Sequence, residues 1–392
     1  MKNNDGRTIL RLIFIGMYIT GLVAVLAQCS GDTSPGPGIL VEPTIPTAIP
    51  APTETASPTQ HPTPAPLYLT TATEVVLPTD KFRLKGLYDD TAVGIVGEGA
   101  ETQVVILDLT TGRMHRIDSS TDARYRASPH ISERWVVWYE SVDAPVGKHR
   151  RLMVYDLDKG HEFQLDNAVP DDLDLSGDIV VWTESMVGDV FAHDLLTDQR
   201  WPVAVRPGGQ FFPRISGQWV IYLEHGENWE EIKDQKYGRY ADLRAYHLDT
   251  GEDFLIGQAP LPNDASVGTH HAIAGSKVVW IQHLPNYKTE LRVYDLETRT
   301  SRPLVLSDGT QITCFLELFG DDALLVKGTR IYSLEDGRLL GVIDTSTVKG
   351  RLSLSTLGSA VYMSGNRVVL STIEESTSGE SIWRLYTLQV KP

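Results

Sequence analysis

The stretch Ser176-Gly177-Asp178-Ile179-Val180-Val181-Trp182 contains a pattern that recurs along most of the chain. It begins with a small residue and a glycine, continues with two variable residues, and ends with an apolar run that often closes on an aromatic residue. Clear copies occupy residues 132–138, 216–222 and 274–280, weaker copies occupy 319–325 and 364–370, and the weakest begins at Tyr88. The copies follow one another at intervals of about 45 residues, which indicates a repeat architecture.

A second pattern follows each copy of the first. Val154-Tyr155-Asp156-Leu157-Asp158-Lys159-Gly160 is a clear example, and related runs occupy residues 105–112, 191–195, 245–251, 293–296, 331–337 and 385–388. The β-branched and aromatic residues favour short strands, and the Asp and Gly that follow favour turns. No segment after Pro66 has a convincing helical period, so the two patterns together predict an all-β fold.

Seven such units predict a β-propeller in which each unit is one four-stranded blade. The repeat favours seven blades, and it leaves six or eight blades as alternatives. The last unit stops at Pro392, just after its third strand, and therefore lacks an outer strand. Residues 68–77, which precede the first unit, have strand-like composition. We expect them to complete the last blade and to close the ring.

At these two patterns the chain resembles the TolB-like propeller family. The resemblance covers roughly residues 85–390 and rests on the paired motifs Ser-Gly-x-x-Val-Val-Trp and Val-Tyr-Asp-Leu-x-Thr-Gly. It implies a propeller fold and says little about activity. Members of this group include a periplasmic envelope protein that works by binding partners, propellers attached to peptidases, and a few polysaccharide lyases.

Residues 1–29 have the order of an export signal. Lys2, Arg7 and Arg11 make a basic start, residues 12–27 are uncharged and mostly apolar, and Cys29 follows. Residues 26–29 resemble the bacterial lipobox, in which cleavage makes the Cys the mature N-terminus and the Cys is acylated. Gln28 departs from this pattern, because the residue before the Cys is normally small. We therefore expect lipidation at Cys29, with an uncleaved signal anchor or simple secretion as alternatives. All three place the remaining chain outside the cytoplasm, and we expect it to be membrane-anchored on the bacterial cell envelope.

Residues 30–66 form a linker rich in Pro and Thr, which contains ten prolines between Pro35 and Pro66. Such a segment buries too little apolar surface to offset the entropy of the chain, and proline biases it to an extended conformation. We expect a disordered tether that holds residues 67–392, the propeller domain, clear of the membrane.

Composition and motifs exclude several classes of function. The chain has 51 acidic and 35 basic residues and a net charge of −16, which disfavours nucleic-acid binding. No nucleophile elbow, Walker loop, dinucleotide fingerprint or zincin motif is present, and we assign no catalytic residue, metal or cofactor. The run from Asp172 through Asp174 to Asp178 mimics the start of a calcium loop. Thr183 stands where its last acidic ligand belongs, and the same Ser-Gly recurs elsewhere without acids.

The best candidates for a binding site are polar residues that lie just before the first pattern of their blades. Alternation along a strand predicts that they line the central channel, where a mixed polar ring can bind a small ligand, a peptide end or a sugar acid. The candidates are His130, Asp174, Arg214, His270, His271, Glu317 and Tyr362. A solvated channel with ion pairs between blades is the structural alternative.

The longest interval between copies contributes a second candidate surface. Residues 224–239 are mostly charged and contain Trp229 and Tyr237, and Tyr240 follows directly. Aromatic side chains among charges in a loop are typical of a partner or glycan contact, and a solvated hairpin is the structural alternative.

The sequence therefore predicts a membrane-tethered, extracytoplasmic propeller that acts as a binding or scaffold module for an envelope protein, a peptide or a glycan. We expect it to be a monomer. A carbohydrate-active lyase or hydrolase that uses a funnel of His and acidic residues is the first alternative, with His130, Gln210, His270 and His271 as possible metal ligands. A structural envelope component is the second.

Overall fold

The structure is a computed structural model, and it describes only part of the chain. The described residues are 68–69, 71–79, 81–117, 123–144, 147–165, 170–184, 188–225, 240–260, 270–284, 288–309, 316–319, 323–326, 329–352, 361–376 and 381–391. The chain divides into two compact units, Met1–Pro64 and Ala65–Pro392, and every described residue belongs to the second. Cys29 and the Pro/Thr-rich linker lie outside the described residues. Within the ranges given, no helix has the length and apolar character needed to cross a membrane.

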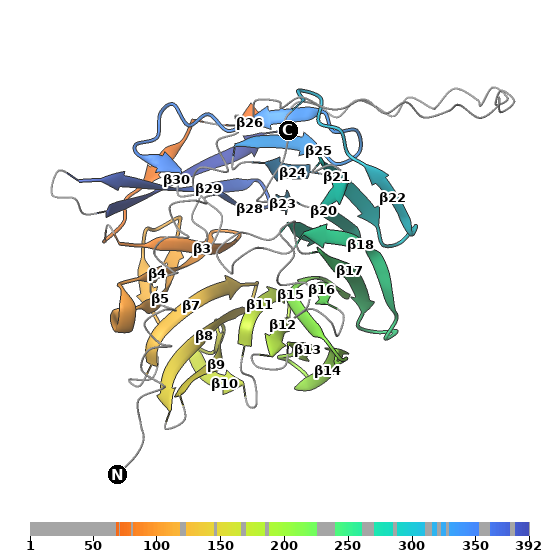
Figure 1. Cartoon of the computed structure of the whole chain (residues 1–392). Helices are drawn as coiled ribbons and strands as arrows, with labels where there is room; N and C mark the ends of the chain where they lie inside the picture. The colour runs from red at the N-terminus through yellow and green to blue at the C-terminus, as the bar shows by residue number, and fades with distance from the viewer. Residues whose placement is uncertain are drawn as a thin grey trace, which may run out of the picture. The chain divides into compact units, whose positions relative to one another are not determined.

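Thirty strands form seven antiparallel sheets in the described part of the chain (Figure 1). We call the sheets blades 1 to 7. Blade 1 contains β3 (Arg83–Tyr88), β4 (Thr91–Val96), β5 (Gln103–Asp108) and β6 (Met114–Arg116), with the 3-10 helix η1 (Gly99–Glu101) before β5. Blade 2 contains β7 (Ala123–Ile131), β8 (Trp135–Ala144), β9 (Gly147–Asp156) and β10 (His161–Leu165). Blade 3 contains β11 (Pro170–Ser176), β12 (Ile179–Glu184), β13 (Asp189–Asp194) and β14 (Gln199–Ala204).

The remaining blades follow in the same order along the chain. Blade 4 contains β15 (Gly209–Ser216), β16 (Trp219–His225), β17 (Tyr240–His247) and β18 (Asp253–Pro260). Blade 5 contains β19 (His271–Ala274), β20 (Lys277–Leu284), β21 (Lys288–Asp295) and β22 (Thr300–Pro303). Blade 6 contains β23 (Leu316–Phe319), β24 (Ala323–Val326), β25 (Arg330–Ser333) and β26 (Leu339–Val342). Blade 7 contains β27 (Arg351–Leu352), β28 (Val361–Ser364), β29 (Arg367–Glu375), β30 (Ser381–Lys391), β1 (Tyr68–Leu69) and β2 (Thr73–Val75). The predicted all-β, seven-bladed propeller is confirmed.

The Ser-Gly pair of the first pattern makes the turn between the first two strands of a blade and also joins neighbouring blades. Gly177 and Gly217 have φ values of 57° and 56°, which glycine adopts at little cost. The serine hydroxyl accepts a hydrogen bond from the backbone N–H at the glycine position of the next blade. These bonds run from Gly217 N to Ser176 Oγ (3.1 Å), from Gly275 N to Ser216 Oγ (2.8 Å) and from Asp89 N to Ser364 Oγ (2.8 Å).

The aspartate of the second pattern makes the turn between the third and fourth strands. In each case one carboxylate oxygen accepts two backbone N–H bonds from the residues that follow it, which is an Asx turn. The residues involved are Asp108, Asp156, Asp194 and Asp295, and Ser333 does the same in blade 6. Both repeating patterns are therefore explained by the residues that form the turns within each blade.

The hydrophobic core consists of seven clusters, and each of them lies between two neighbouring blades. Between blades 2 and 3, for example, Val137 packs with Leu173 and Trp182. Because every sheet is covered on both faces, its middle strands read as continuous apolar runs. One cluster joins Phe82 and Leu107 of blade 1 to residues of blade 7, so the ring is closed.

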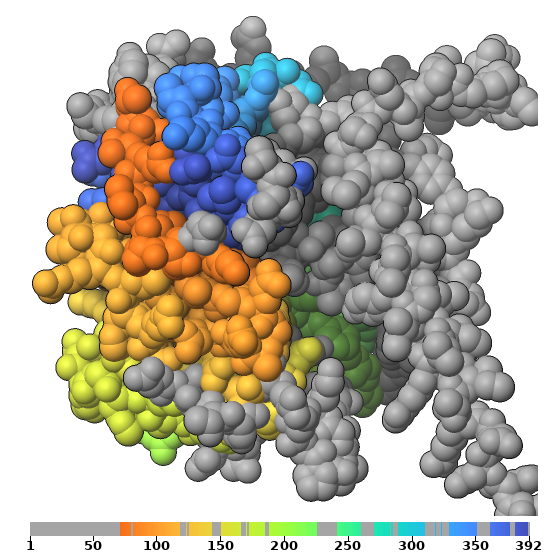
Figure 2. All heavy atoms as spheres, turned by 90° about the vertical axis from the view of Figure 1, so that its left-hand side faces the viewer, coloured from red at the N-terminus to blue at the C-terminus, as the bar shows by residue number. Residues whose placement is uncertain are grey.

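The two ends of the described chain meet in blade 7. β1 and β2 both pair with β30, with Tyr68 opposite Lys391 and Thr73 opposite Thr387. Arg384 of β30 also donates a hydrogen bond to Glu74 at 2.7 Å. In Figure 2 the N-terminal strands, in orange, lie against the blue C-terminal strands. The expected completion of the last blade by residues near the N-terminus is confirmed.

We expect the ring to depend on this closure. A chain lacking residues 1–66 should melt cooperatively, whereas a chain lacking residues 1–80 should lose stability or aggregate. The second deletion removes the pairing with β30 and the apolar contacts of Val75 and Leu77. At about 1 kcal/mol per lost hydrogen bond, plus the lost burial, we expect a loss of roughly 5 kcal/mol. Differential scanning calorimetry of the two chains measures it, and equal melting temperatures would contradict the proposal.

Candidate functional site

The first strands of neighbouring blades contact one another around the centre of the ring. On the first strand of each blade, one residue pairs with the third residue of the second strand, and we call its place the channel position. Examples are His130, which pairs with Val137, and Arg214, which pairs with Ile221. The residues at this position in blades 1 to 7 are Gly86, His130, Asp174, Arg214, Ala272, Glu317 and Tyr362. Blades 2 to 4 therefore place a base or an acid at three consecutive channel positions, and we call His130, Asp174 and Arg214 the polar arc.

Asp174 links three blades. One carboxylate oxygen lies 3.2 Å from His130 Nδ1 of blade 2, and the other accepts a hydrogen bond from the Ile215 backbone N–H of blade 4 at 3.0 Å. Burial acts to raise the pKa of Asp174, but the hydrogen bond from His130 and the electrostatic attraction of His130 and Arg214 outweigh it and lower the pKa. Asp174 is therefore a fixed carboxylate at neutral pH.

Arg214 is held in place from one side only. Its Nη1 donates to Asp172 Oδ2 at 2.9 Å and to the Pro213 carbonyl at 2.6 Å. Its Nε and Nη2 have no hydrogen-bond partner among the described residues, and 22% of the side chain is exposed. The guanidinium therefore keeps donors available for an incoming group.

The acids that mimic a calcium loop in the sequence do not act together. Asp172 binds Arg214, Asp174 binds His130, and Asp178 accepts the Trp135 indole N–H at 2.7 Å. In the part of the chain that the structure describes, no group of three or more His, Cys, Asp or Glu side chains is placed to hold a metal ion. The described residues thus give the lyase or hydrolase alternative no assembled metal site.

His271 does not occupy the channel position of blade 5, because Ala272 holds it. The His271 side chain is only 1% exposed, and its Nε2 lies 2.9 Å from the Phe212 carbonyl of blade 4. Burial, reinforced by the charge of Arg214, lowers the pKa of His271 to about 3. His271 is therefore a neutral group between blades 4 and 5. His270 precedes β19 and is 9% exposed.

Two first strands contain strained residues next to the polar arc. Ser128 and Phe212 are not glycine but have φ values of 49° and 54°, and each precedes a proline within a bulge. Such left-handed conformations persist only where the surroundings hold them, and they are common at functional sites. The bulge in β15 brings the Phe212 carbonyl to His271 and carries Arg214 directly after Pro213.

The structure describes the other sequence candidates only in part. Tyr362 is half-buried and packs against the cluster between blades 7 and 1. Glu317 lies on β23 and Tyr240 begins β17, but their side chains lie outside the described residues. Trp229 and Tyr237 lie outside them altogether.

Lys85 is a candidate that sequence reasoning missed. It lies on β3, the first strand of blade 1, where the register shifts between Leu84 and Gly86. Burial, and to a lesser extent the charge of Arg83, lowers the pKa of Lys85 to about 8. A sizeable fraction of its amine is therefore neutral at physiological pH. The only signal in the sequence is a lysine placed before the weakest copy of the repeat.

No family model matches this chain, and no curated protein matches it. Among solved structures, the β-propeller domain of the trilobed protease from Pyrococcus furiosus aligns with a TM-score of 0.48 at 12% identity, over 83% of this chain and 95% of that one. Oligogalacturonate lyase from Vibrio parahaemolyticus gives 0.47 at 11%, over 82% and 98%. TolB from Acinetobacter baumannii gives 0.38 at 15%, over 78% and 66%. These likenesses concern the propeller fold and carry no inference about activity.

His271 should make the propeller sensitive to acid. Its pKa lies below the ordinary value of 6.5 in the folded chain, so the unfolded chain binds a proton first as the pH falls. The stabilisation by neutral His271 is complete above pH 6.5 and is lost as the pH falls towards 3. Between pH 7.5 and pH 5 we expect a loss of about 2 kcal/mol.

Urea unfolding at a series of pH values measures this loss. His193 also has a lowered pKa and titrates in the same direction, so the comparison is between the wild type and His271→Gln. The glutamine amide can still donate to the Phe212 carbonyl but cannot be protonated. Equal pH slopes for the two proteins would contradict a neutral, buried His271.

Proposed function

We propose that this protein is an extracytoplasmic, membrane-tethered binding module, and that the polar arc binds a carboxylate of its ligand. The observation that carries the proposal is the position of the Arg214 guanidinium. Asp172 and the Pro213 carbonyl hold it, while Nε and Nη2 have no hydrogen-bond partner among the described residues. An arginine that is already positioned binds a carboxylate with little further ordering, and such charge-assisted bonds are strong.

The neighbouring side chains support a ligand that also carries a hydrogen-bond donor. With Nδ1 of His130 facing the Asp174 carboxylate, a neutral His130 donates from Nδ1 and leaves Nε2 as an acceptor. The His130 side chain is 31% exposed, so a ligand in the channel has access to it. A carboxylate for Arg214 and a nearby N–H for His130 occur together at the carboxyl terminus of a polypeptide. We therefore favour an envelope or extracellular partner that presents this terminus.

The repeat motifs and the seven sheets support placing the chain with the TolB-like propellers. The basic start, the apolar run and Cys29 support export and lipidation, and the prolines of residues 30–66 support a tether. In this proposal the lipid retains the protein at the envelope, the tether gives it reach, and the propeller captures the partner.

The polar arc is tested with a chemically defined probe. The full chain is titrated with N-acetylated tetraalanine that has a free carboxyl terminus and with the same peptide amidated, and binding is followed by saturation-transfer NMR. We expect the free acid to bind and the amide to bind at least tenfold more weakly, since a hydrogen bond to a charged group contributes about 1.5–3 kcal/mol. Galacturonate, a sugar acid, replaces the peptide in a parallel titration.

Variants identify the residue responsible. Arg214→Gln should weaken binding of the free acid at least tenfold. Arg292→Gln is the matched control, because Arg292 is also an ion-paired arginine with 23% exposure but lies on β21 of blade 5. Equal binding of acid and amide, or unchanged binding by Arg214→Gln, would contradict the proposal. Tighter binding of galacturonate than of the peptide would favour a glycan as the partner.

The anchor is tested separately. We expect radiolabelled palmitate to enter the full chain expressed in a bacterium and to be absent from Cys29→Ala, because acylation needs this thiol. Fractionation should place the wild type with the membranes. Equal labelling of the two chains would rule out lipidation at Cys29, and a cytoplasmic full chain would rule out export.

A further inference from the structure

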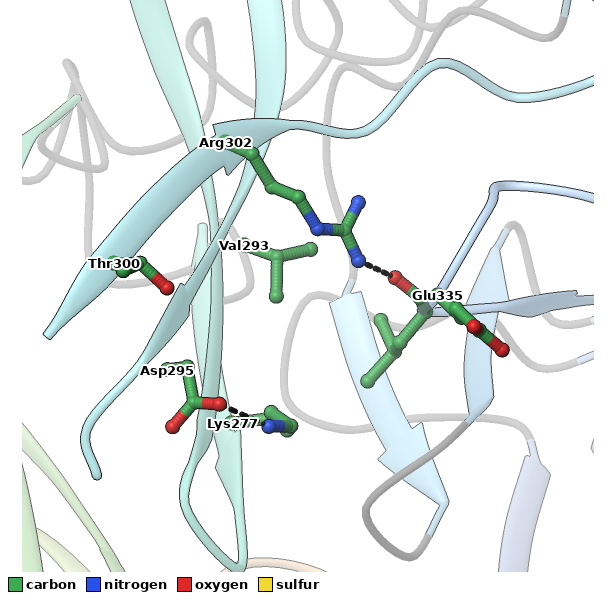
Figure 3. A pocket seen from close by; sticks show the side chains of 7 residues that line it. Lys277, Val293, Asp295, Thr300, Arg302 and Glu335 are labelled. Atoms are coloured by element: carbon green, nitrogen blue, oxygen red, sulfur yellow. Dashed lines mark hydrogen bonds and ion pairs between the residues drawn. The ribbon is translucent and has the colours of Figure 1, made fainter. Parts of the chain in front are cut away.

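A pocket of about 270 Å³ lies between blades 5 and 6, away from the polar arc (Figure 3). Blade 5 contributes Lys277, Asp295, Thr300 and Arg302, and blade 6 contributes Leu334 and Glu335. Figure 3 shows Arg302 reaching from β22 towards blade 6, with the Lys277–Asp295 pair on another side of the opening. The pocket therefore has charged walls from two blades.

The strand register shows what fills the equivalent space in other blades. The first residue of the second strand and one residue of the fourth strand face this groove. In blade 2 they are Trp135 and Phe163, packed edge to face with their ring centroids 6.3 Å apart. In blade 4 they are Trp219 and Phe254, also edge to face at 6.0 Å.

Blade 5 has cations at both of these positions. Arg302 pairs with Val293, which pairs with Val279, the third residue of the second strand; Phe163 and Phe254 have the same place in their blades. Lys277 is the first residue of the second strand, as Trp135 and Trp219 are. The two rings that pack together in blades 2 and 4 are thus replaced by two cationic side chains in blade 5. We attribute the open space between blades 5 and 6 to this replacement.

Each cation is held by a residue with a structural role. Lys277 Nζ lies 2.5 Å from Asp295 Oδ2, while the other oxygen of Asp295 makes the Asx turn after β21. Arg302 Nη2 donates to the Leu334 carbonyl. Arg302 Nε and Nη1 and the exposed Glu335 carboxylate have no hydrogen-bond partner among the described residues. One free donor group and one free acceptor group therefore remain at the pocket.

The pocket has balanced charge, because two basic and two acidic side chains line it. A simple anion or a simple cation would leave one pair unmatched, whereas a zwitterion satisfies both Arg302 and Glu335. Its volume is just below the usual range for ligand pockets of about 300–1,000 Å³, which suits a single small molecule. The buried side chains of Val293 and Leu334 offer an apolar contact for a short aliphatic group.

We propose that this pocket is a second binding site, for a small aliphatic α-amino acid. The ligand carboxylate binds Arg302, its ammonium group binds Glu335, and its side chain contacts Val293 and Leu334. The site is independent of the polar arc, since none of its residues lies on a first strand.

The test uses defined probes and the full chain carrying Arg214→Gln, which removes the carboxylate site proposed at the polar arc. L-alanine and L-valine are the zwitterions, and propionate and ethylamine carry one charge each; ligand-observed NMR measures the binding of all four. We expect both amino acids to bind and each singly charged probe to bind at least about tenfold more weakly. Absence of amino-acid binding up to about 50 mM would overturn the proposal. Equal binding of propionate would do so as well, because it would indicate a simple anion site.

Variants separate this site from the polar arc. Added to Arg214→Gln, the change Arg302→Gln should reduce amino-acid binding at least tenfold. Added to Arg214→Gln in the same way, the double change Lys277→Trp with Arg302→Phe restores the pair found in blades 2 and 4, and it should abolish binding. Its melting temperature, which we expect to be at or above that of Arg214→Gln alone, shows that the variant is folded. Amino-acid binding that survives in this folded variant would overturn the proposal.

Discussion

Burial of both faces of every sheet is the constraint on which the rest of this structure depends. A single blade has two apolar faces and no means of covering them, so each blade is stable only between two neighbours. The seven clusters that join blades in pairs meet this need only if the ring closes. Blade 7 achieves closure by combining β30 with β1 and β2 from the other end of the described chain.

The same constraint restricts where chemistry can reside. The middle strands are mostly apolar, and the polar residues of the two candidate sites lie at the channel positions and in the grooves between outer strands. Each of these positions recurs once per blade in a fixed register. Asp174 and Lys277 illustrate the two cases. Asp174 lies at the channel position that Gly86 holds in blade 1, and Lys277 lies at the groove position that Trp135 holds in blade 2. The residues that we propose to bind ligands are therefore those that differ from their equivalents in other blades.

The sequence was sufficient to predict the number of blades and the closing strands, because both depend on periodicity. The same periodicity named His130, Asp174 and Arg214 among the channel candidates, and their role in binding stays a prediction. The sequence also named His271 as a channel candidate, and this role stays a prediction; the periodicity did not show that its side chain is buried with Nε2 2.9 Å from the Phe212 carbonyl. Bulges change the alternation of side chains in a way that periodicity does not show. Lys85 and the Lys277–Arg302 pocket were missed for a different reason: they depend on burial and on pairing between strands that are distant in the sequence.

The polar arc also ties binding to the integrity of the ring. Asp174 contacts blade 2 through His130 and blade 4 through the Ile215 backbone, while Asp172 of the same strand holds Arg214. Three blades must therefore keep their relative positions for Arg214 to keep its place. A rigid, closed ring holds these groups in position, which would lower the entropy lost when the proposed ligand binds. Closure of blade 7 therefore also supports the proposed binding site.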